Sequence, residues 1–247
     1  MHGVTDAGRC WEPVASAWTG ERAVLAVDAR GHGGTPLPAD GRLAMSTLAQ
    51  DAAAVVRDVL GREVVALGHS MGGLVAEELA ITEPALVAAL VLEDPAWRRD
   101  RGVDERGVLP WLAEAVASAR TEGPDELLAR SHRENRGWPE DEHVAWAAAR
   151  AALDPRLADG PHLWDERHWV EALRDVGAPV TIVTGDPSRG AIVDDALVAR
   201  AGELLGSRLA RVHAPGAGHC VRREARAEFL AAVDAALAAA DARVARG

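Results

Sequence analysis

The stretch of sequence that decides the fold reads Val64-Val65-Ala66-Leu67-Gly68-His69-Ser70-Met71-Gly72-Gly73. It opens with an apolar run of the length of a buried strand, and residues 71–82 that follow have a helical pattern. Between the two stands G-x-S-x-G, whose glycines permit a sharp turn that lifts the Ser70 hydroxyl clear of the backbone. The stretch therefore predicts a serine nucleophile. An ordinary strand-to-helix turn is the plainer alternative.

Strand-like and helix-like segments alternate on both sides of this turn. Short apolar runs that end near Gly, Asp or Pro predict strands at 23–27, 64–67, 88–92 and 180–183, with a less apolar candidate at 208–213. Helical patterns lie between them, at 46–60, 71–82, 194–205 and 222–240. This alternation predicts an α/β fold: a mostly parallel sheet with helices on both faces.

The segment 97–170 differs in composition from its flanks. It holds six of the eight tryptophans and four of the nine histidines of the chain. Its Ala-rich runs at 109–120 and 143–153 read as helices, with breaks at Gly-Pro and Trp-Pro positions. We therefore expect an inserted helical subdomain between two parts of one core.

Composition excludes several classes of function. The formal net charge is −11, and an acidic protein repels phosphate backbones, so no nucleic-acid partner is expected. No apolar run approaches the roughly 18 residues of a membrane span, so no membrane partner is expected either. Two cysteines are too few for a disulfide framework, and the first residues do not resemble a signal peptide. These features favour a cytoplasmic location.

A serine nucleophile needs a base that is oriented by an acid. His219 is the best candidate base, because it follows the last predicted strand in a loop of small residues. Asp186 is the preferred acid, since it leaves the strand 180–183 at the sheet edge where Ser70 is expected. The chain order Ser, Asp, His also fits this arrangement. Asp94 or Glu93, at the end of the preceding strand, could supply the acid instead, and His69 is a weaker candidate for the base.

Together with this turn, two further motifs resemble those of the α/β-hydrolase superfamily. Asp28-Ala29-Arg30-Gly31-His32-Gly33 is similar to the D-x-R-G-H-G loop of many members, and His2-Gly3 to the H-G before the oxyanion hole. The resemblance implies an oxyanion hole formed by the backbone N–H groups of Val4 and Met71. It also implies a core of residues 1–96 and 171–247 with a helical cap at 97–170. One departure is Ser188, which stands where many relatives carry the acid.

The expected function is that of a serine hydrolase that cleaves a carboxylic ester or lactone through an acyl-enzyme. No cofactor and no metal is expected, because the cap histidines and acids lack metal-ligand spacing. The same three side chains could hydrolyse a C–C bond, a thioester or an amide. A non-catalytic small-molecule-binding protein of the same fold is the alternative of a different class.

The cap tryptophans bear on the substrate. If Trp138 and Trp164 face the cleft, they favour a small-molecule substrate with an apolar or ring-bearing acyl group; they could equally form the core of the cap. In the first case, truncating either one should change substrate preference more than stability. The oligomeric state is left open by the sequence.

The start of the sequence departs from the family pattern. In that family three strands precede or adjoin the H-G motif, and here the motif directly follows Met1. By the resemblance, the missing third strand belongs between the strands at 23–27 and 64–67, whose backbone groups would then lack partners. The expectation is a shortened form of a longer hydrolase, poorly soluble or weakly active, that some 20–30 upstream residues would rescue.

Overall fold

The computed structural model describes residues 1–97, 102–105, 107–164 and 167–245. The chain divides into two compact units. The sheet unit consists of Met1, Met45–Arg98 and Arg167–Gly247, and the helical unit consists of His2–Ala44 and Arg99–Glu166. The predicted division differs in residues 2–44, which group with the inserted segment and not with the sheet.

Four parallel strands form the sheet of the first unit. They are β2 (Val64–His69), β3 (Val87–Glu93), β5 (Val180–Thr184) and β6 (Leu209–His213), hydrogen-bonded in the order β2-β3-β5-β6. Every residue of β3 and β5 is buried, as expected for apolar strands covered on both faces. The parallel sheet and four of the five predicted strands are confirmed. Because the strands are parallel, their carboxyl ends meet at one edge.

The fifth predicted strand, at 23–27, is wrong. These residues have no regular secondary structure in the helical unit, and the side chains of Val24 and Leu25 are 39% and 47% exposed. An apolar run becomes a strand only where a neighbouring strand satisfies its backbone N–H and C=O groups. In the sheet unit, β2 forms hydrogen bonds with Met1. The Met1 nitrogen donates to Leu67 O at 2.7 Å, and the His69 N–H donates to Met1 O at 3.1 Å.

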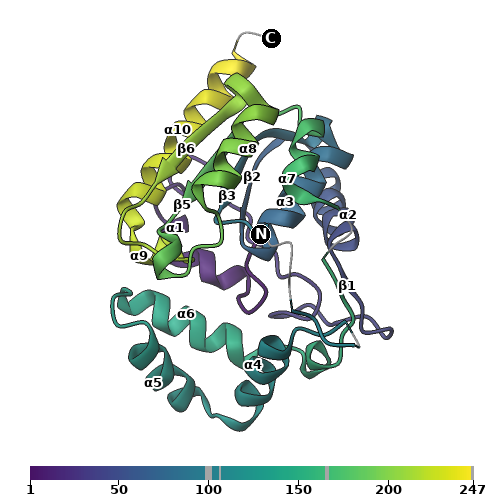
Figure 1. Ribbon diagram of the computed structural model, residues 1–247, viewed down its shortest axis with the longest axis vertical. Coiled ribbons are helices and arrows are strands. Elements are labelled where there is room, and N and C mark those ends of the chain that lie inside the picture. The colour runs from purple at the N-terminus through teal and green to yellow at the C-terminus, as the bar shows by residue number, and fades with distance from the viewer. Residues whose placement is uncertain (98–101, 106, 165–166, 246–247) are drawn as a thin grey trace. The chain divides into compact units, whose positions relative to one another are not determined.

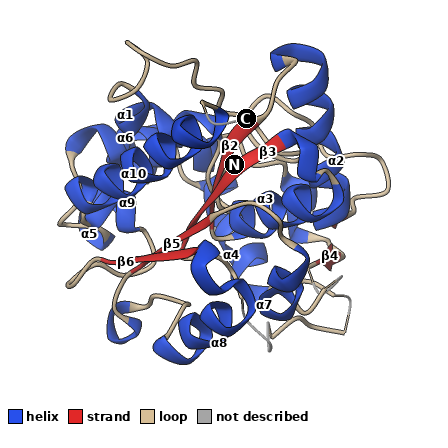
Figure 2. Cartoon of the chain, turned by 90° about the horizontal axis from the view of Figure 1, so that it is seen from above, coloured by secondary structure: helices blue, strands red, loops and turns tan. Residues whose placement is uncertain are grey.

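Helices cover both faces of the sheet (Figure 2). The longest helix packs on one face, and the helix that follows the serine turn packs on the other. The α-helices of the sheet unit are α2 (Met45–Val55), α3 (Met71–Thr82), α7 (Trp169–Ala172), α8 (Asp195–Leu205), α9 (Val221–Glu224) and α10 (Arg226–Val244). The helix predicted at 222–240 is therefore divided at Ala225, which has φ −141° and ψ 62°. Short single-turn helices lie at Pro84–Leu86, Leu173–Asp175, Pro187–Arg189 and Gly206–Arg208, and the chain after α2 continues as a π-helical turn at Val56–Leu60.

The helical unit carries the remaining elements (Figure 1). Its α-helices are α1 (Glu12–Ala15), α4 (Pro110–Thr121), α5 (Pro124–Glu134) and α6 (Glu140–Ala151), with short turns at Gly8–Trp11 and Pro155–Ala158. Two short strands, β1 (Leu43–Ala44) and β4 (His162–Leu163), pair in parallel. The helices expected at 109–120 and 143–153 are thus confirmed as α4 and α6, with shifted ends.

Packing explains why residues 2–44 group with the inserted segment. Ala7 and Cys10 form a buried apolar cluster with Ala145 and Ala149 of α6. Farther along, the guanidinium of Arg156 donates to the backbone oxygens of Leu37 and Pro38. These contacts join the two stretches of chain into one unit.

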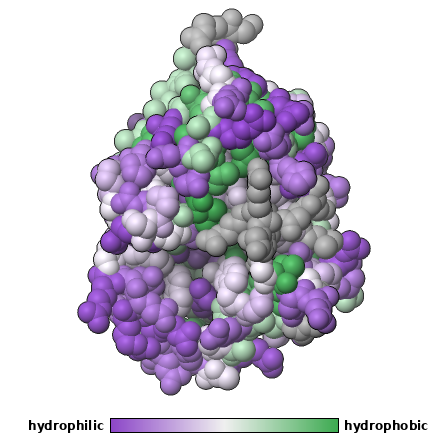
Figure 3. Space-filling model, viewed as in Figure 1, coloured by the Kyte–Doolittle hydropathy of each residue, from purple (hydrophilic) through white to green (hydrophobic). Residues whose placement is uncertain are grey.

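The face of the molecule shown in Figure 3 is mostly hydrophilic in its described part. On the face shown in Figure 3, hydrophobic residues are visible in small groups between charged and polar ones. Among the described residues, no helix is both long enough and apolar enough to cross a membrane.

Candidate active site

Ser70 stands on a sharp turn between β2 and α3. Its backbone has φ 52° and ψ −116°, a strained conformation for a residue with a side chain. The flanking glycines make this turn possible, because a Cβ on Gly68 would lie 2.1 Å from the carbonyl oxygen of Gly72. The Ser70 N–H donates to the Glu93 carbonyl oxygen at 3.1 Å, which ties the turn to the end of β3. The serine is held as the sequence predicts.

The imidazole of His219 contacts Asp94. His219 lies in the irregular segment between β6 and α9, and its Nδ1 is 2.5 Å from Asp94 Oδ2. Asp94 is fully buried directly after β3, and its carboxylate also accepts hydrogen bonds from the backbone N–H groups of Ile192 (2.8 Å) and Val193 (2.9 Å). Three donors thus hold and orient the buried side chain of Asp94. This arrangement fixes the ring with Nδ1 as donor and Nε2 available for another partner.

Asp186 does not contact His219, which corrects the preferred assignment of the acid. Its Oδ1 lies 3.0 Å from His213 Nε2, and its Oδ2 accepts a hydrogen bond from the backbone N–H of Gly216 at 2.7 Å. The physical reason is position in the sheet. Asp186 follows β5, and the neighbouring strand β6 carries His213, which contacts Asp186. The loop after β6 first runs past Asp186, and only then does His219 lie at the end of β3. Of the two alternative acids, Asp94 is the one at the ring.

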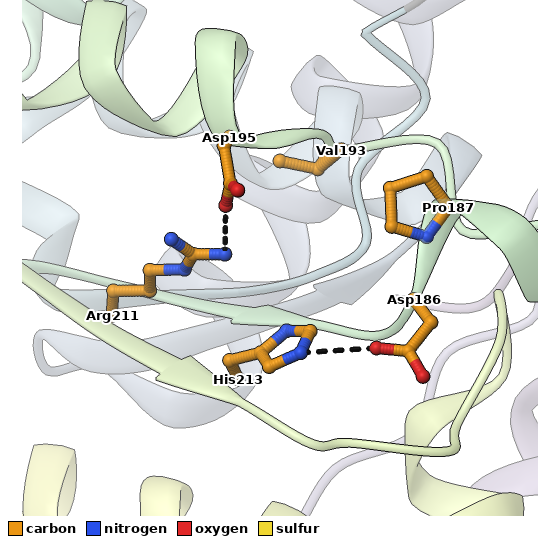
Figure 4. A pocket seen from close by; sticks show the side chains of 6 residues that line it. All are labelled: Asp186, Pro187, Val193, Asp195, Arg211 and His213. Atoms are coloured by element: carbon orange, nitrogen blue, oxygen red, sulfur yellow. Dashed lines mark hydrogen bonds and ion pairs between the residues drawn. The ribbon is translucent and has the colours of Figure 1, made fainter.

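Asp186 is one of the residues that line a surface pocket of about 470 Å³ (Figure 4). In this view Asp186 faces His213, and Asp195 faces Arg211 at 2.7 Å. Pro187 and Val193 complete the lining. The carboxylate of Asp186 is therefore engaged with β6 and its loop.

His69 has a supporting position beside His219. The ring Nε2 of His69 donates to the His219 carbonyl oxygen at 3.0 Å, and the two ring centroids are 4.7 Å apart. An imidazole nitrogen used in this way holds the loop backbone. The contact also places His219 next to the residue that precedes Ser70.

The two expected oxyanion-hole residues belong to different units. Met71 is the first residue of α3, where backbone N–H groups have no partner within the helix. Val4 is buried in the helical unit, and its carbonyl oxygen is 2.6 Å from His32 Nε2. Their joint role stays a prediction.

The two motifs of the resemblance meet within the helical unit. His2 Nε2 accepts a hydrogen bond from the backbone N–H of Ala29 at 3.0 Å, and Asp28 accepts from the N–H groups of Gly8 and Gly34. Burial, followed by the neighbouring His32, lowers the pKa of His2 to about 3. His2 is thus neutral at physiological pH, and it fixes the D-x-R-G-H-G loop against the H-G segment.

The tryptophans of the segment 97–170 are mainly packing residues. Trp164 is buried, and Trp138 is partly buried against a cluster formed by Leu127, Trp146 and Ala147. Trp97 and Trp169 belong to the sheet unit. Trp111 is about half exposed. Whether Trp138 or Trp164 lines a substrate pocket stays a prediction.

Two adjacent glutamates of α3 hold the chain at the points where the inserted segment begins and ends. Glu77 Oε2 accepts a hydrogen bond from the indole Nε1 of Trp97 at 2.9 Å. Glu78 binds the guanidinium of Arg167 through both carboxylate oxygens, one of them 2.9 Å from Nη2. Both ends of the insertion are therefore attached to α3, the helix that follows Ser70.

We expect Glu77→Gln to flatten the pH dependence of stability. Complete burial raises the pKa of Glu77 well above its usual value, against the hydrogen bond from Trp97. In the unfolded chain this carboxyl ionises near pH ~4.3, so the folded state loses stability as the pH rises above that value. The loss is about 1.4 kcal/mol per pH unit until the folded-state pKa is reached.

Urea unfolding at several pH values between 5 and 8 measures this effect. The free energy of unfolding of Glu77→Gln should exceed that of the wild type by a margin that grows with pH. Parallel curves for the two proteins would show that Glu77 is ionised in the folded state.

The sequence predicted Ser70 and His219 at this site and considered Asp94 second. The supporting contacts from His69, Ile192 and Val193 were missed. An acid directly after a fully apolar strand, as in Leu92-Glu93-Asp94, is the signal that could have ranked Asp94 higher. In the described part of the chain, no group of three His, Cys, Asp or Glu side chains could hold a metal ion.

A serine on a strained strand-to-helix turn, with a histidine–carboxylate pair nearby, is the arrangement typical of serine hydrolases on parallel sheets. The chain belongs to the alpha/beta hydrolase family, whose model matches residues 1–233.

Several known proteins similar to this chain are hydrolases. It is 32% identical over 224 residues to the lipase LipV of Mycobacterium tuberculosis, covering 84% of this chain and 80% of that protein. It is 28% identical to the 2-(acetamidomethylene)succinate hydrolase of Mesorhizobium japonicum, covering 90% and 80%. Among solved structures, the esterase RhEst1 from Rhodococcus sp. ECU1013 has a TM-score of 0.71 at 25% identity, covering 95% and 87%. Family and relatives together support hydrolase activity.

Proposed function

We propose that the chain is a serine hydrolase that cleaves a carboxylic ester or lactone of a small molecule. The observation that carries the proposal is the 2.5 Å contact between His219 Nδ1 and the buried carboxylate of Asp94. Acyl transfer to a serine requires a histidine as base and an acid that orients it, and these groups lie beside a serine on a strained turn here. The activities named for similar proteins, a lipase and an esterase, favour the ester bond.

The chemistry follows from the roles of these side chains. Ser70 Oγ attacks the substrate carbonyl carbon and passes its proton to His219 Nε2, while Asp94 accepts the hydrogen bond from Nδ1–H. The negative charge that develops on the carbonyl oxygen is stabilised by backbone N–H groups, among which we assign that of Met71 at the start of α3. Each such donor lowers the barrier by ~3 kcal/mol. His219 then protonates the leaving alkoxide, and a water molecule hydrolyses the acyl-enzyme by the same steps. Neither a metal nor an organic cofactor takes part.

The acyl group is proposed to be apolar or ring-bearing. Trp138 carries this part of the proposal, because its side chain is only partly buried whereas that of Trp164 is buried. A location in the cytoplasm is proposed on composition alone.

A fluorophosphonate probe tests whether Ser70 is a nucleophile. The wild type should be labelled with one probe molecule per chain, and Ser70→Ala should lose all labelling and all ester hydrolysis while its unfolding curve is unchanged. Failure of a folded wild-type sample to label would favour a non-catalytic binding protein. A panel of esters of increasing chain length, lactones, thioesters and amides then identifies the bond. Faster cleavage of an amide or a thioester than of any ester would redirect the proposal.

A further inference from the structure

Glu93 and Arg222 form an ion pair from which solvent is completely excluded. Both side chains have no exposed surface, and Arg222 Nη1 is 3.1 Å from Glu93 Oε2. The second carboxylate oxygen, Oε1, accepts a hydrogen bond from the backbone N–H of Arg222 at 2.7 Å. One carboxylate thus binds both the side chain and the main chain of the same residue.

The two residues lie beside the two halves of the proposed catalytic pair. Glu93 directly precedes Asp94 at the end of β3, and Arg222 follows His219 by three positions. The carbonyl oxygen of Glu93 also accepts the N–H of Ser70. The main chain of Glu93 is therefore fixed to the serine turn, and its side chain is fixed to the segment that carries the histidine.

The segment around His219 is held by side-chain contacts and not by secondary structure of its own. The chain from Ala214 to Cys220 has no regular secondary structure, and α9, which follows, is only four residues long. Stability does not explain a buried ion pair here, because apolar residues of similar volume are often as stable or more stable in its place. The geometry that the pair enforces is a better reason for its presence.

We propose that Glu93 is a positioning residue, which sets the distance between His219 and Asp94 because its side chain anchors the main chain at Arg222, and with it the His219 segment, to the end of β3. The inference rests on the proposed function for its catalytic meaning. Neither side chain touches the substrate. The contact that matters most is the one from Glu93 Oε1 to the Arg222 backbone N–H, since it fixes the main chain on which His219 stands.

Two double variants separate this role from a purely structural one. Glu93→Gln with Arg222→Met removes both buried charges and keeps an amide oxygen for the Arg222 backbone N–H. Glu93→Leu with Arg222→Met removes the charges and that acceptor as well. Glu78→Gln with Arg167→Met, at the ion pair on α3, serves as the matched control away from the His219 segment. For each protein, kcat and KM on the best ester, the urea midpoint, and the low-field NMR signal of the His219 Nδ1 proton are measured.

The proposal expects kcat within about threefold of the wild type for the Gln/Met variant, with the NMR signal in place. The Leu/Met variant should lose at least tenfold in kcat while its KM is unchanged. Its His219 Nδ1 proton signal should be shifted or lost, and its urea midpoint should be no lower than that of the Gln/Met variant. Equal kcat and equal signals in the two variants would overturn it. If the Leu/Met variant does not fold, loss of the signal in a folded Gln/Met variant would overturn it too. Failure of the proposed function gives a different result: the wild type would not react with the fluorophosphonate probe. The His219 Nδ1 proton signal would still show whether the contact between His219 and Asp94 depends on Glu93.

Discussion

Asp94→Asn is expected to lower kcat by about 10⁴-fold without unfolding the protein, because an amide in place of the carboxylate holds the wrong tautomer of the histidine. The carboxylate of Asp94 is the group that accepts the His219 Nδ1–H. An amide can still accept from one of the two backbone N–H groups of Ile192 and Val193, so most of the local structure should remain. Ester hydrolysis at saturating substrate measures the effect, with circular dichroism as the check on folding.

Asp186→Asn is the matched control for that experiment. It is the same change of side chain at the neighbouring strand end, and the amide can still accept the Gly216 N–H while the contact between the carboxylate and His213 is changed. We expect activity within about tenfold of the wild type. A 10⁴-fold loss in Asp186→Asn together with near-normal activity in Asp94→Asn would return the role of the acid to Asp186.

Gly185→Ala is expected to reduce both activity and stability strongly. A Cβ at this position would lie 2.3 Å from the carbonyl oxygen of Gly218 and 2.5 Å from that of Ala217, and both are main-chain atoms next to His219. Backbone must move to make room, and a displacement of about 1 Å at a catalytic group can cost 10²-fold in rate. We therefore expect a loss of 10²-fold or more in kcat and a lower urea midpoint.

Gly202→Ala shows what the same added methyl group does where there is space. Gly202 lies inside α8, and the nearest atom to a Cβ there is Leu209 Cδ2 at 3.7 Å, an ordinary contact. Alanine in a helix interior is favoured over glycine by ~0.8–1 kcal/mol, so this variant should be more stable and fully active. Unchanged kcat in Gly185→Ala would mean that the loop around His219 adapts without cost to the reaction.

The sequence was sufficient where one local pattern decides the outcome. The apolar runs of β3 and β5 are buried on both faces and leave little choice of structure, and Ser70 follows from the glycines around it. The sequence was insufficient where the local structure depends on a residue or strand that is distant along the chain. Residues 23–27 have the composition of a strand and lack a paired neighbour, so they are irregular.

The choice of acid depended on distant partners in the same way. Asp94 and Asp186 both follow strands at one sheet edge, and local sequence treats them alike. The path of the loop after β6 distinguishes the two acids. The backbone N–H of Gly216 in this loop donates to Asp186, and His219, three residues later, contacts Asp94. That path is fixed by contacts across more than a hundred positions, such as the one from Glu93 to Arg222.

The attachment of Trp97 and Arg167 to neighbouring residues of α3 has a consequence for how such a protein can diversify. The chain leaves the sheet unit and returns to it at almost the same place, so the intervening residues form a loop whose ends are already closed. Lengthening a closed loop costs little conformational entropy, about 0.6 kcal/mol for each doubling. The insertion can therefore change in length at little cost in loop-closure entropy while both of its ends stay attached to α3.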